Sequence, residues 1–213
     1  MPTQLSVFNG ALRLLGEERM TDENANTKPG RELRSAWGDV TQRTFEEYNW
    51  NFASERTLLQ RLSETPAHSY DYYYAKPDDW LRTIAIRSTA DDFGDTILYY
   101  VDEGGTDANP KGRIATSESA VYLRYISSGY LTRIGNWPQI FADYVAGLLA
   151  QEICPGITGN STKMESIAAM VRRRKHDAIN WDSVQNPPRM TRVGRLVRSR
   201  YGSSRSTQGG AQD

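Results

Sequence analysis

The residue types that usually perform chemistry are scarce in this chain. It contains two histidines, His68 and His176, and one cysteine, Cys154. Neither histidine has a second ligand at a spacing typical of a metal site, and a single cysteine completes no cysteine-based zinc pattern. Cys154 ends an apolar run before Pro155-Gly156, which favours a small buried residue over a nucleophile paired with a base. We therefore expect His68 in a loop and His176 in solvent, and we predict no metal, no cofactor and no enzymatic activity.

Adjacent acidic residues occur in four places. Neighbouring side chains point to opposite faces of a strand, and on a helix they diverge by about 100°. A glycosidase needs two carboxylates that face one cleft, and adjacent acids do not predict that geometry. We expect solvated carboxylates at all four pairs. The pairs are Glu17-Glu18, Glu46-Glu47, Asp78-Asp79 and Asp91-Asp92.

The 26 basic and 26 acidic residues cancel, yet they are distributed unevenly. Residues 186–213, here called the C-terminal arm, contain six arginines and one acid, so residues 1–185 carry the compensating negative charge. Such an asymmetry is typical of a basic tail with an acidic or nucleic-acid partner. A second basic run, 172–175, lies on a predicted helix and wraps around it. It favours either a solvated helix end, where cations suit the dipole of the last turns, or a charged subunit interface.

The arm combines an arginine series with an apolar series. Pro187-Pro188 separates it from the preceding helix, and Gly194 weakens helix formation within it. Three interpretations remain open: a docking arm for a partner protein, a nucleic-acid-binding tail, and a solvated terminus without a partner. The residues that would dock are Arg189, Met190, Arg192, Val193, Arg195, Leu196, Val197, Arg198 and Tyr201.

Apolar residues at helical spacing occur near both ends of residues 1–185. Gly16 is expected to cap the first helix, and the polar stretch 21–28 forms a loop before the second. Asn136 is expected to cap the third helix and Pro155-Gly156 to end it. Thr162 with Glu165 has the spacing of a capping box for the fourth. The predicted helices are residues 3–15, 31–48, 136–154 and 162–181.

The middle of the chain has short runs of β-branched and aromatic residues, broken by turn residues. No helix long enough for a parallel crossover lies between them, which favours antiparallel pairing. The predicted strands are residues 52–62, 70–75, 81–87, 96–101, 113–116 and 120–127.

The expected fold class is therefore α+β, a bundle of about four helices with an inserted antiparallel β-sheet domain and an extended C-terminal arm. We expect a soluble protein, because no segment approaches the roughly 18 apolar residues of a membrane span and the start lacks the features of a signal peptide. The predicted regions are bundle helices in 1–50, an inserted β region in 51–133, bundle helices in 134–185 and the arm in 186–213.

Several stretches resemble the head-to-tail adaptor family of short-tailed bacteriophages, also called tail tubular protein A. Tyr48-Asn49-Trp50-Asn51-Phe52-Ala53 resembles the family's passage from a helix into an aromatic strand. Residues 70–82 resemble its Tyr-rich strand and Pro-x-Asp turn, here Pro77 to Asp79. Trp137-Pro138 with Phe141 resembles the opening of its Ala- and Leu-rich helix. The resemblance spans residues 5–180 and depends on the order and spacing of these motifs. Its structural residues are Trp50, Phe52, Pro77, Asp79, Trp137 and Phe141.

The resemblance implies a virion protein made in the cytoplasm of a bacterial host. Its partners would be a portal protein and a tail nozzle or tube protein, within a homo-oligomeric ring of twelve subunits. Double-stranded DNA would pass through the channel without sequence recognition, and no membrane or catalytic residue is implied. Two departures are Lys76, where the family often has an apolar residue before the proline, and the arm, which does not align. The alternatives are a virion-associated cell-wall hydrolase and a nucleic-acid-binding protein that uses its basic tail.

Overall fold

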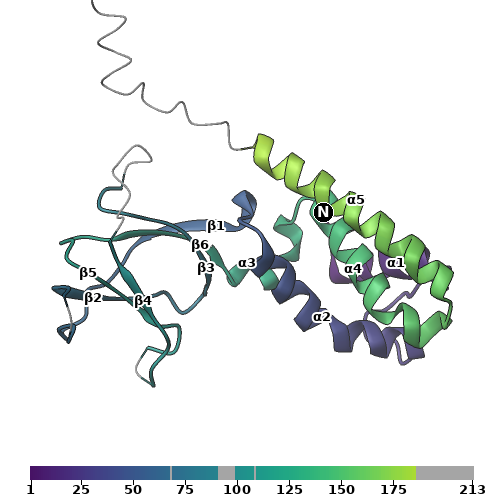
Figure 1. Ribbon diagram of the computed structural model, residues 1–213. Coiled ribbons are helices and arrows are strands. Elements are labelled where there is room, and N and C mark those ends of the chain that lie inside the picture. The colour runs from purple at the N-terminus through teal and green to yellow at the C-terminus, as the bar shows by residue number, and fades with distance from the viewer. Residues whose placement is uncertain (68, 91–98, 108, 186–213) are drawn as a thin grey trace, which may run out of the picture.

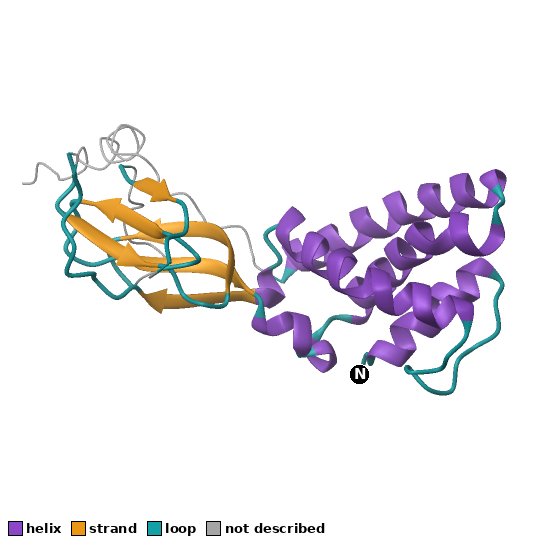
Figure 2. Cartoon of the chain, turned by 90° about the horizontal axis from the view of Figure 1, so that it is seen from below, coloured by secondary structure: helices purple, strands orange, loops and turns teal. Residues whose placement is uncertain are grey.

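The computed structural model describes residues 1–67, 69–90, 99–107 and 109–185, which form two lobes (Figures 1 and 2). Helices make up one lobe, and six strands make up the other. The helices are α1 (Gln4–Leu15), α2 (Lys28–Glu47), α3 (Gly129–Thr132), α4 (Gln139–Thr158) and α5 (Ser161–Val184), with short 3-10 helices η1 (Asn51–Ala53) and η2 (Ile134–Asn136). This arrangement confirms the predicted α+β class, with the β region inserted between helical segments.

Helix α4 is the central helix of the helical lobe. It packs against α1, α2 and α5, which lie around it. By length and apolar composition alone, this helix could cross a membrane, whereas we expected no segment of that kind. More than half of this helix is buried inside the protein. A helix that is covered on several sides carries apolar residues around most of its circumference, so its central position accounts for its composition.

The ends of the first two helices are set by side-chain caps. At α1, Thr3 Oγ1 accepts from the Ser6 amide at 3.1 Å, and Gly16 ends the helix with a φ of 71°, as predicted. Helix α2 begins at Lys28 rather than at residue 31. Thr27 Oγ1 accepts from the Gly30 amide at 3.2 Å, so the predicted loop 21–28 ends earlier than expected.

Three predicted boundaries of α4 and α5 are wrong. Helix α4 begins at Gln139, so Asn136 does not cap it. Asn136 is the last residue of η2, and Trp137-Pro138 is extended between η2 and α4. Pro155 lies inside the last turn of α4, where only one backbone hydrogen bond is lost, and the helix ends at Gly159 with a φ of 59°. At α5, the Asn160 side chain accepts from Lys163 N, so Thr162 is not the cap.

The β lobe contains two antiparallel three-stranded sheets rather than one. The first has the order β1-β6-β3 and the second β2-β5-β4. The strands are β1 (Ser54–Leu58), β2 (Tyr72–Ala75), β3 (Trp80–Arg87), β4 (Val101–Glu103), β5 (Arg113–Thr116) and β6 (Tyr122–Ser127). The predicted strand 52–62 is shorter, because η1 precedes it. The predicted strand 96–101 is also displaced: its residues 96–98 lie outside the described residues, and β4 begins at Val101.

The chain between β1 and β2 links the two sheets. The Leu59 amide donates to Val121 of the first sheet at 2.8 Å, whereas the Leu62 amide donates to Tyr73 of the second sheet, also at 2.8 Å. The side chains between the sheets form a small core of their own. It consists of Leu59, Tyr74, Ile86, Ile114, Val121, Leu123 and Tyr125.

Candidate functional site at the junction of the lobes

Trp50 is the centre of the connection between the two lobes. It follows α2 directly, its side chain is fully buried, and its indole N–H donates to the Thr44 carbonyl at 2.7 Å. The ring meets Phe141 of α4 edge-on, with centroids 4.8 Å apart, and Phe52 also packs on Phe141 at 4.8 Å. The residues that carried the family resemblance in two separate stretches of the chain thus pack against one another.

The aromatic cluster extends from this point into the helical lobe. Trp137, 3 % exposed, stacks on Trp37 of α2 at 5.8 Å and packs edge-on against Phe141 at 5.2 Å. Its indole N–H donates to the Tyr130 carbonyl at 2.7 Å, so the segment that returns from the β lobe is tied to the same cluster. Edge-on and stacked aromatic pairs contribute about 0.5–1.5 kcal/mol each beyond burial. Both passages of the chain between the lobes are therefore held by one set of rings.

Asp182 forms a second connection, from the last turn of α5 to the start of the β lobe. The residue is 1 % exposed. Its carboxylate accepts from the Asn51 amide at 2.8 and 3.0 Å, from the Phe52 amide at 3.3 Å and from Asn51 Nδ2 at 3.1 Å. Burial raises the pKa of Asp182, while the Asn51 and Phe52 donors and the Arg124 charge act in the opposite direction.

Arg124 of β6 completes this junction. Its guanidinium donates to Asn51 Oδ1 at 2.9 Å and to Ser54 Oγ at 3.2 Å. Asn51 therefore bridges an anion on α5 and a cation on the first sheet. Neither Asp182 nor Arg124 was predicted from the sequence to be a site residue. A signal for Asp182 exists, because it continues the spacing of the buried α5 residues Val171 and Ala178.

The Pro77–Asp79 turn has a structural role in the β lobe. The Asp79 carboxylate accepts from Ser127 Oγ at 2.5 Å and from Tyr125 Oη at 3.0 Å. Its carbonyl accepts from the Ser128 amide at 2.7 Å. These bonds join the turn before β3 to the end of β6, where the chain leaves for α3. Burial, followed by the hydrogen bond to Asp79, raises the pKa of Tyr125.

Lys76, which departs from the resembled pattern, is buried before this turn. Its side chain is 3 % exposed, and its Nζ lies 2.5 Å from an Asp102 carboxylate oxygen and 3.8 Å from the centroid of the Trp80 ring. An ammonium over an indole face gains a cation–π interaction. The aliphatic part of the lysine is thus buried, while its ammonium group is stabilised by the Asp102 carboxylate and the face of the Trp80 ring.

Substitutions at this pair should have unequal effects. Lys76→Met keeps the volume and removes the buried charge, so its cost should stay below about 1 kcal/mol. Asp102→Ala leaves the buried ammonium without its carboxylate and should cost about 2 kcal/mol, less than a fully buried pair would, because the Asp102 side chain is 42 % exposed. Urea denaturation of both variants measures the difference. If Lys76→Met cost as much stability as Asp102→Ala, or more, the ion pair would not determine the stability of this site.

Two of the acids predicted to be solvated accept structural hydrogen bonds, and one of them, Glu47, is also exposed as predicted. Besides Asp79, Glu47 accepts from Tyr144 Oη at 2.6 Å and from Lys175 Nζ at 2.7 Å, which joins α2 to α4 and α5. Burial and the bond to Glu47 raise the pKa of Tyr144. Glu46 and Asp78 are exposed, as are Glu17-Glu18. Asp91-Asp92 lie outside the described residues.

The basic run 172–175 also differs from its prediction. Helix α5 continues to Val184, so the run lies in the middle of the helix and the dipole of the last turn does not apply to it. Arg174 donates to the Asp143 carbonyl at 2.7 Å, and Lys175 pairs with Glu47. Arg172 and Arg173 remain exposed on the outer face of α5.

The remaining candidates for chemistry stay apart. Cys154 is buried, and its Sγ lies 3.3 Å from the Thr158 hydroxyl. His176 is exposed beside Asn180, and His68 lies outside the described residues. In the described part of the chain, no group of three or more His, Cys, Asp or Glu residues is placed to hold a metal ion.

Two open hollows of about 320 Å³ each lie away from the junction. One, on the helical lobe between α1 and α4, is lined by Ser6, Asn9, Gly10, Arg13, Arg19, Gln139 and Asp143. The other, on the β lobe, lies between the end of β1, the Lys76–Asp78 turn and residues 109–111. The nine predicted docking residues of the arm, Arg189 to Tyr201, lie outside the described residues.

A scan against protein-family models finds no family that matches this chain, and no curated protein matches it.

Proposed function

We propose that this chain is a structural protein of a short-tailed bacteriophage virion, a head-to-tail adaptor whose copies form a ring. The ring would join the portal to the tail nozzle or tube and continue the DNA channel, through which double-stranded DNA passes without sequence recognition. Twelve copies would make one ring, as the family resemblance implies. The protein would be made in the cytoplasm of the bacterial host.

The convergence of the resembled residues at the junction carries this proposal. Trp50 and Phe52 come from the passage into the β lobe, and Trp137 and Phe141 come from the passage out of it. A connector subunit must transmit force between two partners, one at each end. A junction packed with buried aromatic rings between two chemically different lobes suits that task, since helices and sheets offer different surfaces to the two partners (Figure 2).

Ring formation on a portal tests the proposal. The purified protein should be monomeric or weakly associated alone and should form a closed ring when mixed with its portal, because head-to-tail contacts close when the rotation between neighbours fits. Light scattering and negative-stain microscopy measure this. Free monomer as the sole species after mixing would contradict the adaptor function.

The arm is proposed to contribute to portal attachment. An arginine-rich segment with apolar residues can lie in a groove between portal subunits, where guanidinium groups pair with carboxylates. Truncation after Gln185 should leave a folded protein that no longer attaches to filled heads, because each weak contact counts many times around a ring. Attachment of the truncated protein at full-length affinity in physiological salt would reject the docking arm. Binding of the arm to DNA with a steep salt dependence would favour the nucleic-acid alternative instead.

A further inference from the structure

Strand β4 is a free edge of the second sheet. It pairs only with β5, with Val101 opposite Ala115 and Glu103 opposite Arg113. The other outer strand, β2, is partly covered, because residues 60–62 bond to Tyr73 and Ala75 along its outer side. An edge strand presents backbone N–H and C=O groups that can pair with another extended chain. Among the described strands of this sheet, β4 therefore offers the open edge.

Large apolar side chains are exposed along this edge. Tyr99, Tyr100 and Val101 follow one another in the sequence and are 79 %, 38 % and 37 % exposed. Soluble proteins seldom leave consecutive large apolar residues in water, and such patches often mark interaction sites. Among the described residues no strand pairs with the outer side of β4, which leaves that side available to an extended segment of another molecule.

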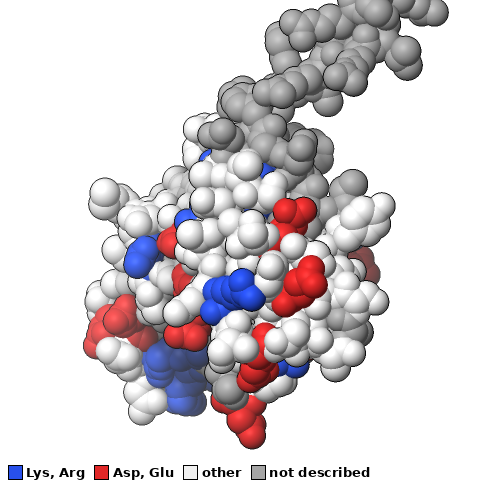
Figure 3. All heavy atoms as spheres, turned by 90° about the vertical axis from the view of Figure 1, so that its left-hand side faces the viewer, with Lys and Arg blue, Asp and Glu red and all other residues white. Residues whose placement is uncertain are grey.

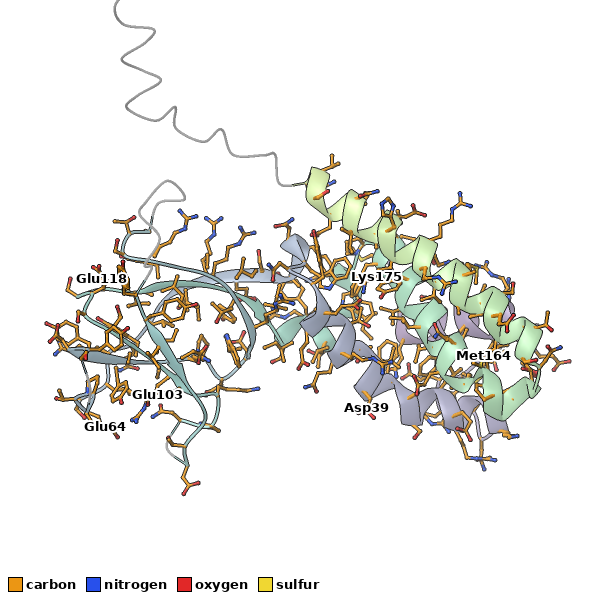
Figure 4. The ribbon with its side chains drawn as sticks, in the orientation of Figure 1. Asp39, Glu64, Glu103, Glu118, Met164 and Lys175 are labelled. Atoms are coloured by element: carbon orange, nitrogen blue, oxygen red, sulfur yellow. The ribbon has the colours of Figure 1, made fainter. Side chains whose placement is uncertain are left out.

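The surroundings of the edge are acidic. Asp107 and Glu118 are exposed, and Asp102, which pairs with Lys76, is also partly open to solvent. The Thr116 hydroxyl lies 3.2 Å from the Tyr99 carbonyl and 3.4 Å from the Glu118 amide, which places Glu118 beside the exposed tyrosine. The nearest cation on β5, Arg113, is already paired with Glu103 and Glu64. Figure 3 shows acidic side chains at this end of the β lobe, interspersed with Lys and Arg, and Figure 4 labels Glu64, Glu103 and Glu118.

We propose that the β4 edge binds the arginine-rich segment 189–201 of a second copy as an added strand. Five arginines of that segment match the acidic side chains near the edge, and its valines, leucine and tyrosine match the exposed apolar residues. Guanidinium groups also stack on tyrosine rings. A segment of 28 residues can span up to about 90 Å when extended, which is enough to reach a neighbouring molecule. Main-chain hydrogen bonds supply affinity in such strand additions, and the flanking side chains supply specificity.

The contact between two copies should be weak, because β4 has three residues and forms few backbone bonds. Repetition of the same contact around an assembly would supply the missing affinity. The inference goes beyond the proposed adaptor function and concerns the protein before it meets a portal. Its test contains no portal, so its failure is distinguishable from failure of the adaptor proposal.

Hydrogen exchange on the full-length protein tests this contact. A synthetic peptide of residues 186–213, added in excess, should slow amide exchange in residues 100–103. A peptide with all five arginines of residues 189–201 changed to Gln should bind at least about tenfold more weakly, because it loses the charge attraction. Higher salt should weaken the wild-type peptide and leave the glutamine peptide nearly unaffected.

Matched surface variants locate the contact. Tyr99→Ser with Tyr100→Ser should weaken the peptide by about tenfold, since two ring contacts are lost. Leu58→Ser is the control, because Leu58 is 55 % exposed on the other sheet and should leave binding unchanged. The proposal is overturned by absence of binding, by protection outside residues 99–103 or by an equal effect of Leu58→Ser. Protection of residues 100–103 in a strictly monomeric full-length protein, relative to the protein truncated after Gln185, would place the arm on its own chain and also overturn the proposal.

Discussion

Replacement of Trp50 by alanine should destabilise the protein by about 3–5 kcal/mol. The indole is fully buried, and its removal leaves a cavity between α2, α4 and the start of the β lobe. It also leaves the Thr44 carbonyl without the indole donor that now lies 2.7 Å from it. A buried carbonyl without a hydrogen-bond donor costs free energy in addition to the lost packing. Urea denaturation followed by far-ultraviolet circular dichroism measures the change.

Trp181 provides the matched control for this substitution. It is the same residue type on α5, but it is 39 % exposed, so Trp181→Ala should cost less than about 1 kcal/mol. A structural role for Trp50 predicts loss of stability and of ring assembly together. A Trp50→Ala protein that melts at the wild-type temperature and lacks only one specific activity would refute that role.

Periodicity predicted the class of the fold because it depends on local spacing. The helices α1 and α5 and the strands β3 and β5 follow from residues near one another in the sequence, and the antiparallel direction follows from the lack of a crossover helix between the strands. Boundaries were less predictable where two caps compete. Asn160 caps α5 although Thr162 with Glu165 has the capping-box spacing, because the side chain that lies closest to the free amides decides the start of the helix.

The division of the β region into two sheets could not be predicted from the strands alone. It depends on the segment from Leu59 to Leu62, in which the Leu59 amide bonds to the first sheet and the Leu62 amide to the second. Which strand an amide meets is a long-range property that local alternation does not encode.

The aromatic residues of the junction were predicted from the sequence and the polar ones were not, although the spacing of Asp182 from Val171 and Ala178 places it on the buried face of α5. Trp50, Phe52, Trp137 and Phe141 were singled out by resemblance, and the structure brings them into one cluster. Asp182 was overlooked because an acid near a helix end is usually solvated. Its buried position is compensated by donors that come from residues 130 positions away, and no spacing within α5 reveals them.

Replacement of Asp182 by alanine should cost about 3 kcal/mol. The Asn51 and Phe52 amides would lose a charged acceptor inside the junction, and a buried donor without an acceptor costs about 1–3 kcal/mol. Arg124 would also lose a nearby compensating charge. Asp177→Ala is the matched control, because Asp177 is an exposed acid five residues earlier on the same helix. Its effect should stay within about 0.5 kcal/mol. Thermal and urea denaturation of the three proteins measure these differences.

The pH dependence of the same site has a defined sign. Because burial raises the pKa of Asp182 in the folded protein, the native state holds its proton more tightly than the unfolded chain does. Its contribution to the free energy of unfolding is therefore largest below the ordinary aspartate pKa of about 3.9. It decreases as the pH rises from there through the raised folded pKa, and it is constant above that value. Asp182→Asn removes the titration, so the free energy of unfolding of the wild type relative to this variant should fall across that window and then level off. A relative stability that rises with pH would mean that the amide donors and Arg124 outweigh burial. The pKa of Asp182 in the folded protein would then be lowered, and the junction would favour the ionised carboxylate.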